Sequence, residues 1–144
     1  MNRAVTFEGR GELVQLLPGG QLKTLWKSRL PAFPHKVFLS SQGHVVLLDT
    51  HAGSGQGKNA LVIYSSRGEL IANYDFNTVV PDVDDRKRFY YALSGFYLSS
   101  VYTVRWATYA GVPHLTLRDR DGKGPTINLT TGEFKTVWNG QSRR

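Results

Sequence analysis

Short apolar runs, separated by segments that contain glycine or proline, recur along the whole chain. Many of these runs alternate apolar and polar residues, which is the two-residue period of a β-strand with one face in the core. The connecting segments carry the Gly, Asn, Asp and Ser residues that tight turns between antiparallel strands use. The pattern predicts an all-β fold of antiparallel meander sheets, in a single β-rich domain over residues 1–144.

The predicted strands group into three units that repeat at roughly 45 residues, a period expected of propeller blades. The units cover roughly residues 4–30, 35–76 and 93–138. In the first unit, glycine-rich turns, beginning with Gly9-Arg10-Gly11, separate strands at Ala4–Glu8, Glu12–Leu17 and Gln21–Lys27. Along the third of these strands, the two-residue period places Leu22, Thr24 and Trp26 on one face and lysines on the other.

The second unit contains four predicted strands, and its two inner strands differ from those of the first unit. Val45–Leu48 and Ala60–Tyr64 are continuously apolar rather than alternating. Because successive side chains of a strand point to opposite faces, an unbroken apolar strand requires cover on both of them. We therefore expect this unit to lie between two neighbouring sheets.

Residues Asn77–Phe89, which follow the second unit, break the strand pattern. Acidic residues precede basic ones there, an order that suits the helix dipole, and Asp82 is a suitable N-cap. A helical turn and an irregular loop both fit this segment. The third unit then returns to alternation, with strands at Leu93–Ser99, Val101–Ala110, His114–Asp119, Thr126–Leu129 and Phe134–Trp138.

Several stretches resemble parts of a propeller blade. His35–Asp49 is similar to the start of a bacterial β-propeller blade, and Ala60–Tyr64 followed by Arg67-Gly68-Glu69-Leu70 resembles the later hairpin of such a blade. Leu117–Lys123 repeats that hairpin in the third unit. The resemblance implies blade-type four-stranded units and no particular substrate. Because propellers close with about four to eight blades, three units predict an incomplete propeller or a stacked-sheet sandwich.

Composition narrows the chemistry and the location. The chain has no cysteine, which excludes disulfides and cysteine-ligated metals or cofactors. No apolar run approaches the roughly 20 residues that span a bilayer, so membrane insertion is not expected. The first residues lack the apolar core of a signal peptide. A cytoplasmic location is therefore favoured, or a periplasmic or secreted one if a leader has been removed.

The net charge of +7 suits an anionic partner such as nucleic acid. Most Lys and Arg residues are dispersed, but three of them form a tight cluster that many aromatic residues follow. Lys and Arg residues beside aromatic side chains are typical of surfaces that bind single-stranded nucleic acid. The candidate residues for a partner or a polyanion are Arg86, Lys87, Arg88, Tyr90 and Arg105.

Motifs for catalysis and for cofactor binding are sparse. The glycine-rich segment Gly53–Lys58 lacks the Gly and the Ser or Thr of a phosphate-binding loop, because Ala52 and Asn59 occupy their places. We expect this segment to be a mobile hairpin loop without bound phosphate. The candidate metal ligands are His35, Asp49 and His51, which fall within one hairpin. No cofactor and no catalytic residue is predicted.

Three functions follow from these features. The preferred one is a non-enzymatic binding module for a protein partner or for a second copy of the chain, because three blade-like units leave sheet faces and edges unpaired. The run that ends in Val137 and Trp138 is one such edge. The alternative is binding of nucleic acid or another polyanion through the basic and aromatic segment. The third is a metal-dependent hydrolase that uses the hairpin with His and Asp residues.

Overall fold

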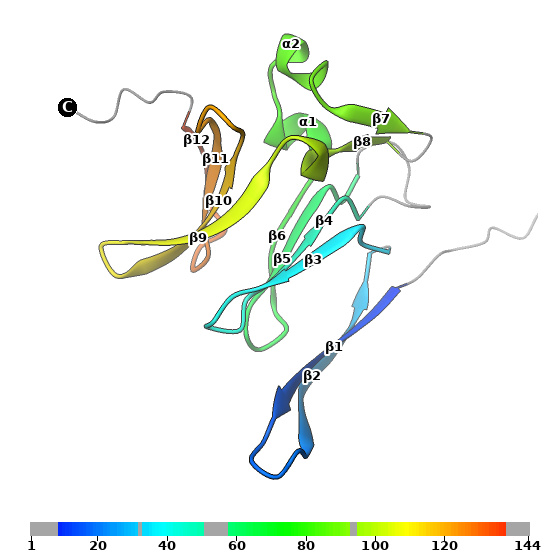
Figure 1. Cartoon of the computed structure of the whole chain (residues 1–144), viewed down its shortest axis with the longest axis vertical. Coiled ribbons are helices and arrows are strands. Elements are labelled where there is room, and N and C mark those ends of the chain that lie inside the picture. Colours follow the sequence, from blue (N-terminus) through cyan, green and yellow to red (C-terminus); the bar gives the residue numbers. More distant parts are fainter. Residues whose placement is uncertain (1–8, 32, 51–57, 93–94, 138–144) are drawn as a thin grey trace, which may run out of the picture.

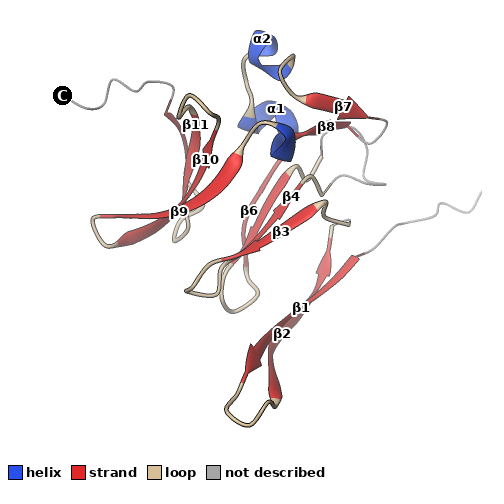
Figure 2. Cartoon of the chain, in the orientation of Figure 1, coloured by secondary structure: helices blue, strands red, loops and turns tan. Residues whose placement is uncertain are grey.

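Antiparallel β-strands dominate the structure, a computed structural model that describes residues 9–31, 33–50, 58–92 and 95–137. Helices are limited to short turns of chain between the sheets (Figure 2). The described strands form two four-stranded sheets and two two-stranded hairpins, and neither large sheet closes into a barrel. The all-β prediction is confirmed. The predictions made for the glycine-rich loop at residues 53–57 and for Trp138 concern residues outside these ranges.

Each large sheet is a simple meander in which strands adjacent in sequence lie side by side. The N-terminal hairpin pairs β1 (Gly9–Leu16) with β2 (Leu22–Leu30). The middle sheet contains β3 (Lys36–Leu39), β4 (Val45–Leu48), β5 (Leu61–Tyr64) and β6 (Leu70–Tyr74) in that order. The C-terminal sheet contains β9 (Thr103–Tyr109), β10 (Val112–Arg118), β11 (Gly124–Asn128) and β12 (Phe134–Val137) in that order.

The hairpin and the two large sheets stack as layers, with the middle sheet at the centre (Figure 1). One face of the middle sheet, including Val46, forms a core with Leu115 and other residues of the C-terminal sheet. The opposite face, including Leu47, packs against Leu13 and Trp26 of the hairpin. Every side chain of β4 and β5 is buried. The prediction that these strands are covered on both faces is therefore confirmed.

The N-terminal hairpin begins earlier than the sequence pattern predicts. Gly9-Arg10-Gly11, expected to be a turn, lies inside β1 and pairs with the end of β2. The strand predicted at Ala4–Glu8 lies outside the described residues. A Cβ added to Gly11 would lie 3.1 Å from the side chain of Leu30. Gly11 therefore leaves room for the side chain of Leu30 to pack against β1, and it does not mark a turn.

A bulge between β1 and β2 reverses the faces of the outer half of the hairpin. The register shifts after Leu13, so Leu13 lies opposite Trp26 while Val14 lies opposite Thr24. Adjacent residues of β1 point to opposite faces, and directly opposed residues share a face. Trp26 therefore faces the middle sheet and Thr24 faces away from it, so the single shared face predicted for them is wrong. The Thr24 hydroxyl accordingly donates a hydrogen bond to Glu12, on the outward face of β1.

Two short helices follow the middle sheet. Asp75 caps α1 (Phe76–Val79), and Asp82 caps α2 (Val83–Arg86) by accepting hydrogen bonds from the backbone N–H groups of Asp84 and Asp85. The helical turn that was one of the two structures predicted here, with Asp82 as its cap, is confirmed.

A second hairpin, of β7 (Tyr90–Ala92) and β8 (Gly95–Tyr97), replaces the first strand predicted for the third unit. The predicted strand Leu93–Ser99 is shorter in the structure and does not join the C-terminal sheet, because β8 pairs with β7. The two helices, this second hairpin and a 3₁₀ turn, η1 (Leu98–Ser100), lie between the two large sheets in the sequence. We call these elements together the connector. The connector contributes Phe76, Val79, Val80, Phe89 and Leu98 to the larger core.

Candidate binding surfaces

The basic cluster predicted to bind a polyanion is engaged in contacts within the protein. The guanidinium of Arg86 donates hydrogen bonds to the carbonyl oxygens of Val80 and Pro81, at 2.8 and 3.0 Å. Lys87 forms an ion pair of 3.0 Å with Asp84, three residues earlier. These contacts fix the chain around α2, so this segment does not present three unpaired cations to a ligand.

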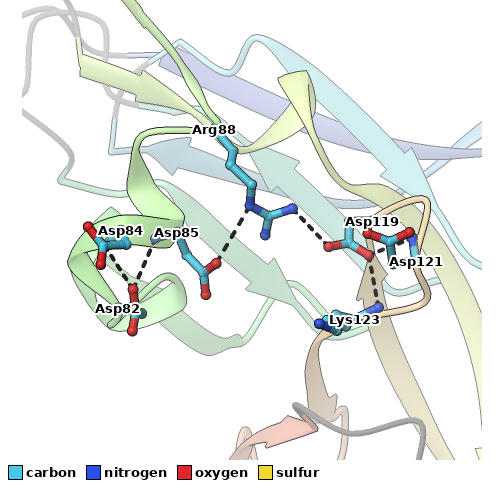
Figure 3. A network of polar contacts seen from close by, with 7 residues as sticks. All are labelled: Asp82, Asp84, Asp85, Arg88, Asp119, Asp121 and Lys123. Carbon is cyan, nitrogen blue, oxygen red and sulfur yellow. Dashed lines mark hydrogen bonds and ion pairs between the residues drawn. The ribbon is translucent and has the colours of Figure 1, made fainter.

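Arg88, the third base of the cluster, ties the connector to the C-terminal sheet (Figure 3). Its guanidinium lies 3.0 Å from the carboxylate of Asp119 and 3.6 Å from that of Asp85. Asp119 is buried and also accepts hydrogen bonds of 2.9 Å from the backbone N–H groups of Asp121 and Lys123. Burial raises the pKa of Asp119, but these N–H groups and Arg88 outweigh burial, so its pKa lies below the usual value.

The five residues predicted to bind a partner or polyanion belong to α2 and the residues after it, to β7 and to β9. Arg86, Lys87 and Arg88 belong to the end of α2 and the residues after it. Tyr90 lies on β7, where its exposed ring is 5.8 Å from the ring of a β8 tyrosine. Arg105 lies on β9 in the C-terminal sheet and is exposed there. The sequence could not reveal that Arg86, Lys87 and Arg88 are engaged within the protein, because it does not show which side chains are paired in space.

The candidate metal ligand Asp49 has a structural role instead. Its carboxylate is 2% exposed and accepts hydrogen bonds from the backbone N–H of Leu98 and from both the N–H and the hydroxyl of Ser99. His35 packs its ring against a tyrosine of β8, and His51 lies outside the described residues. In the described part of the chain, no three His, Cys, Asp or Glu residues gather as metal ligands would. The hydrolytic function that the sequence suggested as a third one stays a prediction.

The N-terminal hairpin covers only the centre of one face of the middle sheet. Val45, Leu47 and other side chains of β4 and β5 are buried beneath it. Val37 and Leu39 of β3 lie directly opposite Leu47 and Val45, so they share this face, yet they are 58% and 56% exposed. The cause is the mismatch between a hairpin of two strands and a sheet of four.

The outward face of the hairpin is also apolar. Leu16 and Leu22 are directly opposed at its tip and are 69% and 68% exposed. Val14 shares their face and is partly exposed as well. We call Val14, Leu16 and Leu22 the hairpin patch. Figure 1 shows that the tip of the hairpin projects away from the rest of the molecule.

The C-terminal sheet has one apolar face and one polar face. Leu115, Leu117 and Ile127 point into the core that this sheet shares with the middle sheet. On the other face, a row of directly opposed residues crosses all four strands, and it consists of Arg105, Thr116, Thr126 and Lys135. The sequence did not reveal that Lys135 lies in the same row as Arg105.

Comparisons with known proteins add no relative. No protein family model matches the chain, and neither a curated protein nor a solved structure matches it. Among the helices that the structure describes, none has the length and apolar character needed to cross a membrane. The case for a function therefore depends on the surfaces of the molecule itself.

Proposed function

We propose that the chain is a non-enzymatic interaction module that binds a second copy of itself through its N-terminal layer. The observation that carries the proposal is that a two-stranded hairpin lies over a four-stranded sheet. This arrangement leaves two neighbouring residues of β3, Val37 and Leu39, more than half exposed beside the hairpin. Exposed apolar groups that lie together in this way are typical of interaction surfaces.

The hairpin also offers backbone hydrogen-bonding groups. Among the described strands, β1 and β2 pair only with each other, so each has an edge that another strand can join. Such an edge is a template for pairing with another chain. A strand added beside the hairpin widens the N-terminal layer towards the width of the sheet beneath it.

The sequence of β1 favours a second copy as the source of that strand. When two β1 strands pair antiparallel about Gly11, Arg10 of each copy lies opposite Glu12 of the other. Both charged side chains are exposed in the single chain. Opposite charges directly across an antiparallel pair stabilise it. Pairing of this kind gives a two-fold dimer, which is the commonest closed assembly.

The same pairing gives the propeller resemblance a specific form. The middle and C-terminal sheets are each four-stranded meanders, as propeller blades are, whereas the described part of the N-terminal layer has two strands. Two hairpins that pair through β1 make a shared layer in the order β2-β1-β1-β2. We infer that the chain is an incomplete propeller-like stack whose missing half-layer is supplied by its partner copy.

The exposed residues of β3 provide the first test, by sedimentation equilibrium at tens of micromolar protein. We expect a dimer for the wild-type chain, and at least a tenfold weaker association for the double variant Val37→Lys/Leu39→Lys, because the added strand would bury two charges without partners. Val83→Lys is the matched control, since Val83 is 65% exposed on α2. It should leave association unchanged.

Charge exchange in β1 provides the second test. Arg10→Glu and Glu12→Arg should each weaken the dimer because they place like charges opposite one another, and the double variant should restore it. A wild-type chain that stays monomeric would refute self-association. If truncation after Glu133 abolished the dimer while the hairpin variants kept it, the interface would lie at the C-terminal edge.

A further inference from the structure

Two hollows on the outward face of the C-terminal sheet meet at one arginine. The first, of about 390 Å³, is lined by residues that include Tyr109, His114 and Lys135. The second, of about 480 Å³, is lined by residues that include Arg105 and Arg120. Arg118 lines both hollows. The two hollows therefore adjoin at Arg118, and we call the surface that they line the track.

The track is predominantly cationic. Arg105, Arg120 and Lys135 are exposed, and Arg118 is half-buried between them. Arg105 and Lys135 stand on the two outermost strands of the sheet, which places their Cα atoms about 14 Å apart at ordinary strand spacing. Two acidic residues also line the track, Glu133 and Asp119. The carboxylate of Asp119 is neutralised by its ion pair with Arg88.

Hydrogen bonds hold the planar guanidinium of Arg118 in a fixed orientation within the track. The guanidinium of Arg118 donates hydrogen bonds to the carbonyl oxygens of Leu117, Gly124 and Pro125 and to the Thr126 hydroxyl, at 2.7–3.0 Å. Its N–H groups are thus used within the sheet. A guanidinium held in this way offers its planar face for stacking.

An aromatic pair lies at one end of the track. The ring of Tyr109 is 51% exposed and lies 5.0 Å from the ring of His114, edge to face. His114 is itself held by a hydrogen bond of 2.8 Å from its Nδ1 to the carbonyl oxygen of Val112. Because a carbonyl oxygen only accepts, Nδ1 is the donor in this bond, which holds the ring in place. The exposed tyrosine is therefore supported from one side and open to a ligand on the other.

We propose that this face of the C-terminal sheet binds single-stranded nucleic acid, with the phosphates along Arg105 and Lys135 and bases stacked on Tyr109 and on the guanidinium of Arg118. An extended cationic track with flat stacking groups is what sequence-tolerant binding of single strands requires. The rings and the guanidinium favour nucleic acid over a polyanion that has no bases. The surface is separate from the N-terminal layer, so the proposal does not depend on self-association.

The test measures the fluorescence anisotropy of labelled oligo(dT) and oligo(U) over a range of salt concentrations. Arg105→Glu/Lys135→Glu should weaken binding by more than tenfold and reduce the slope of log K against log salt by about 1.4, at roughly 0.7 for each lost phosphate contact. Lys23→Glu/Lys27→Glu makes the same change in net charge on the hairpin. It should alter binding by less than about threefold.

Tyr109→Ala separates nucleic acid from other polyanions. It should weaken oligonucleotide binding by about tenfold, the scale of one lost base stack, while heparin binding stays unchanged. The variants must keep the wild-type circular dichroism. The proposal would be overturned if Arg105→Glu/Lys135→Glu and Lys23→Glu/Lys27→Glu lost oligonucleotide affinity equally, or if Tyr109→Ala had no effect. Either result would show that only net charge attracts the oligonucleotide.

Discussion

Two buried carboxylates, Asp49 and Asp119, hold the connector against the two large sheets. Asp49 follows β4 and accepts three hydrogen bonds from Leu98 and Ser99 of η1. It has a φ of 58°, a left-handed conformation that Asp tolerates better than most residues. Asp119 follows β10 and pairs with Arg88. Because their oxygens are engaged by these donors, both acids act as anchors within the fold.

The Asp119–Arg88 pair gives a prediction about pH. Since the pKa of Asp119 is lowered on folding, the charged carboxylate adds stability that is present above its unfolded pKa, about 3.9, and disappears as the pH falls through the folded value. We expect Asp119→Asn to lower the free energy of unfolding by about 1–3 kcal/mol at pH 7. The difference from wild type should shrink below about pH 4.

Urea denaturation at several pH values checks this prediction. Asp84→Asn is the control, because Asp84 forms an exposed ion pair with Lys87 that should contribute less than about 1 kcal/mol. A difference between wild type and Asp119→Asn that stayed constant down to pH 2.5 would show that the charge of Asp119 is not the source of its effect.

At the scale of elements, the contact between the hairpin and the middle sheet depends on a glycine. Gly68, in the turn between β5 and β6, has a φ of +79°, and a Cβ added to it would lie 2.9 Å from the ring of Trp26. Gly111, in the turn between β9 and β10, has a φ of +77° and no atom within 4 Å of the added Cβ. The two positions share their backbone conformation and differ in their contacts.

We therefore expect Gly68→Ala to destabilise the protein more than Gly111→Ala does. Both alanines incur the left-handed backbone strain of about 1 kcal/mol, but only the first must also displace Trp26. The tryptophan emission maximum and the midpoint of thermal unfolding should both shift more for Gly68→Ala than for Gly111→Ala. Equal shifts for the two variants would mean that the hairpin does not rest on this turn.

The elements that the sequence predicted well are those set by local pattern. The unbroken apolar runs of β4 and β5 predicted their burial on both faces, and the alternation along Val101–Ala110 predicted the strand β9. The bulge after Leu13 was missed because it depends on how two strands pair, which a period along one strand does not encode. The pairing of Arg86 with two carbonyl groups was missed for a similar reason, since those carbonyls become neighbours only when α2 forms.

At the scale of the whole molecule, the two cores are unequal. Among the residues that the structure describes, the larger core joins the middle and C-terminal sheets and the connector through sixteen buried residues, whereas the core beneath the hairpin has six. Of those six, only Leu13 and Trp26 come from the hairpin itself. Because the stability of a layer follows the apolar area that it buries, we expect the hairpin to open without unfolding the rest.

Two leucine truncations test this difference in stability. Leu115→Ala removes a fully buried side chain of the larger core and should lower the global free energy of unfolding by about 2–5 kcal/mol. Leu13→Ala, in the smaller core, should mainly speed hydrogen exchange of the β1 and β2 amides. The measurement is native-state exchange at a concentration below the dimer dissociation constant, so that pairing between copies does not protect the hairpin. If Leu13→Ala sped exchange equally in β1, β5 and β10, the hairpin would belong to the same cooperative unit as the two large sheets.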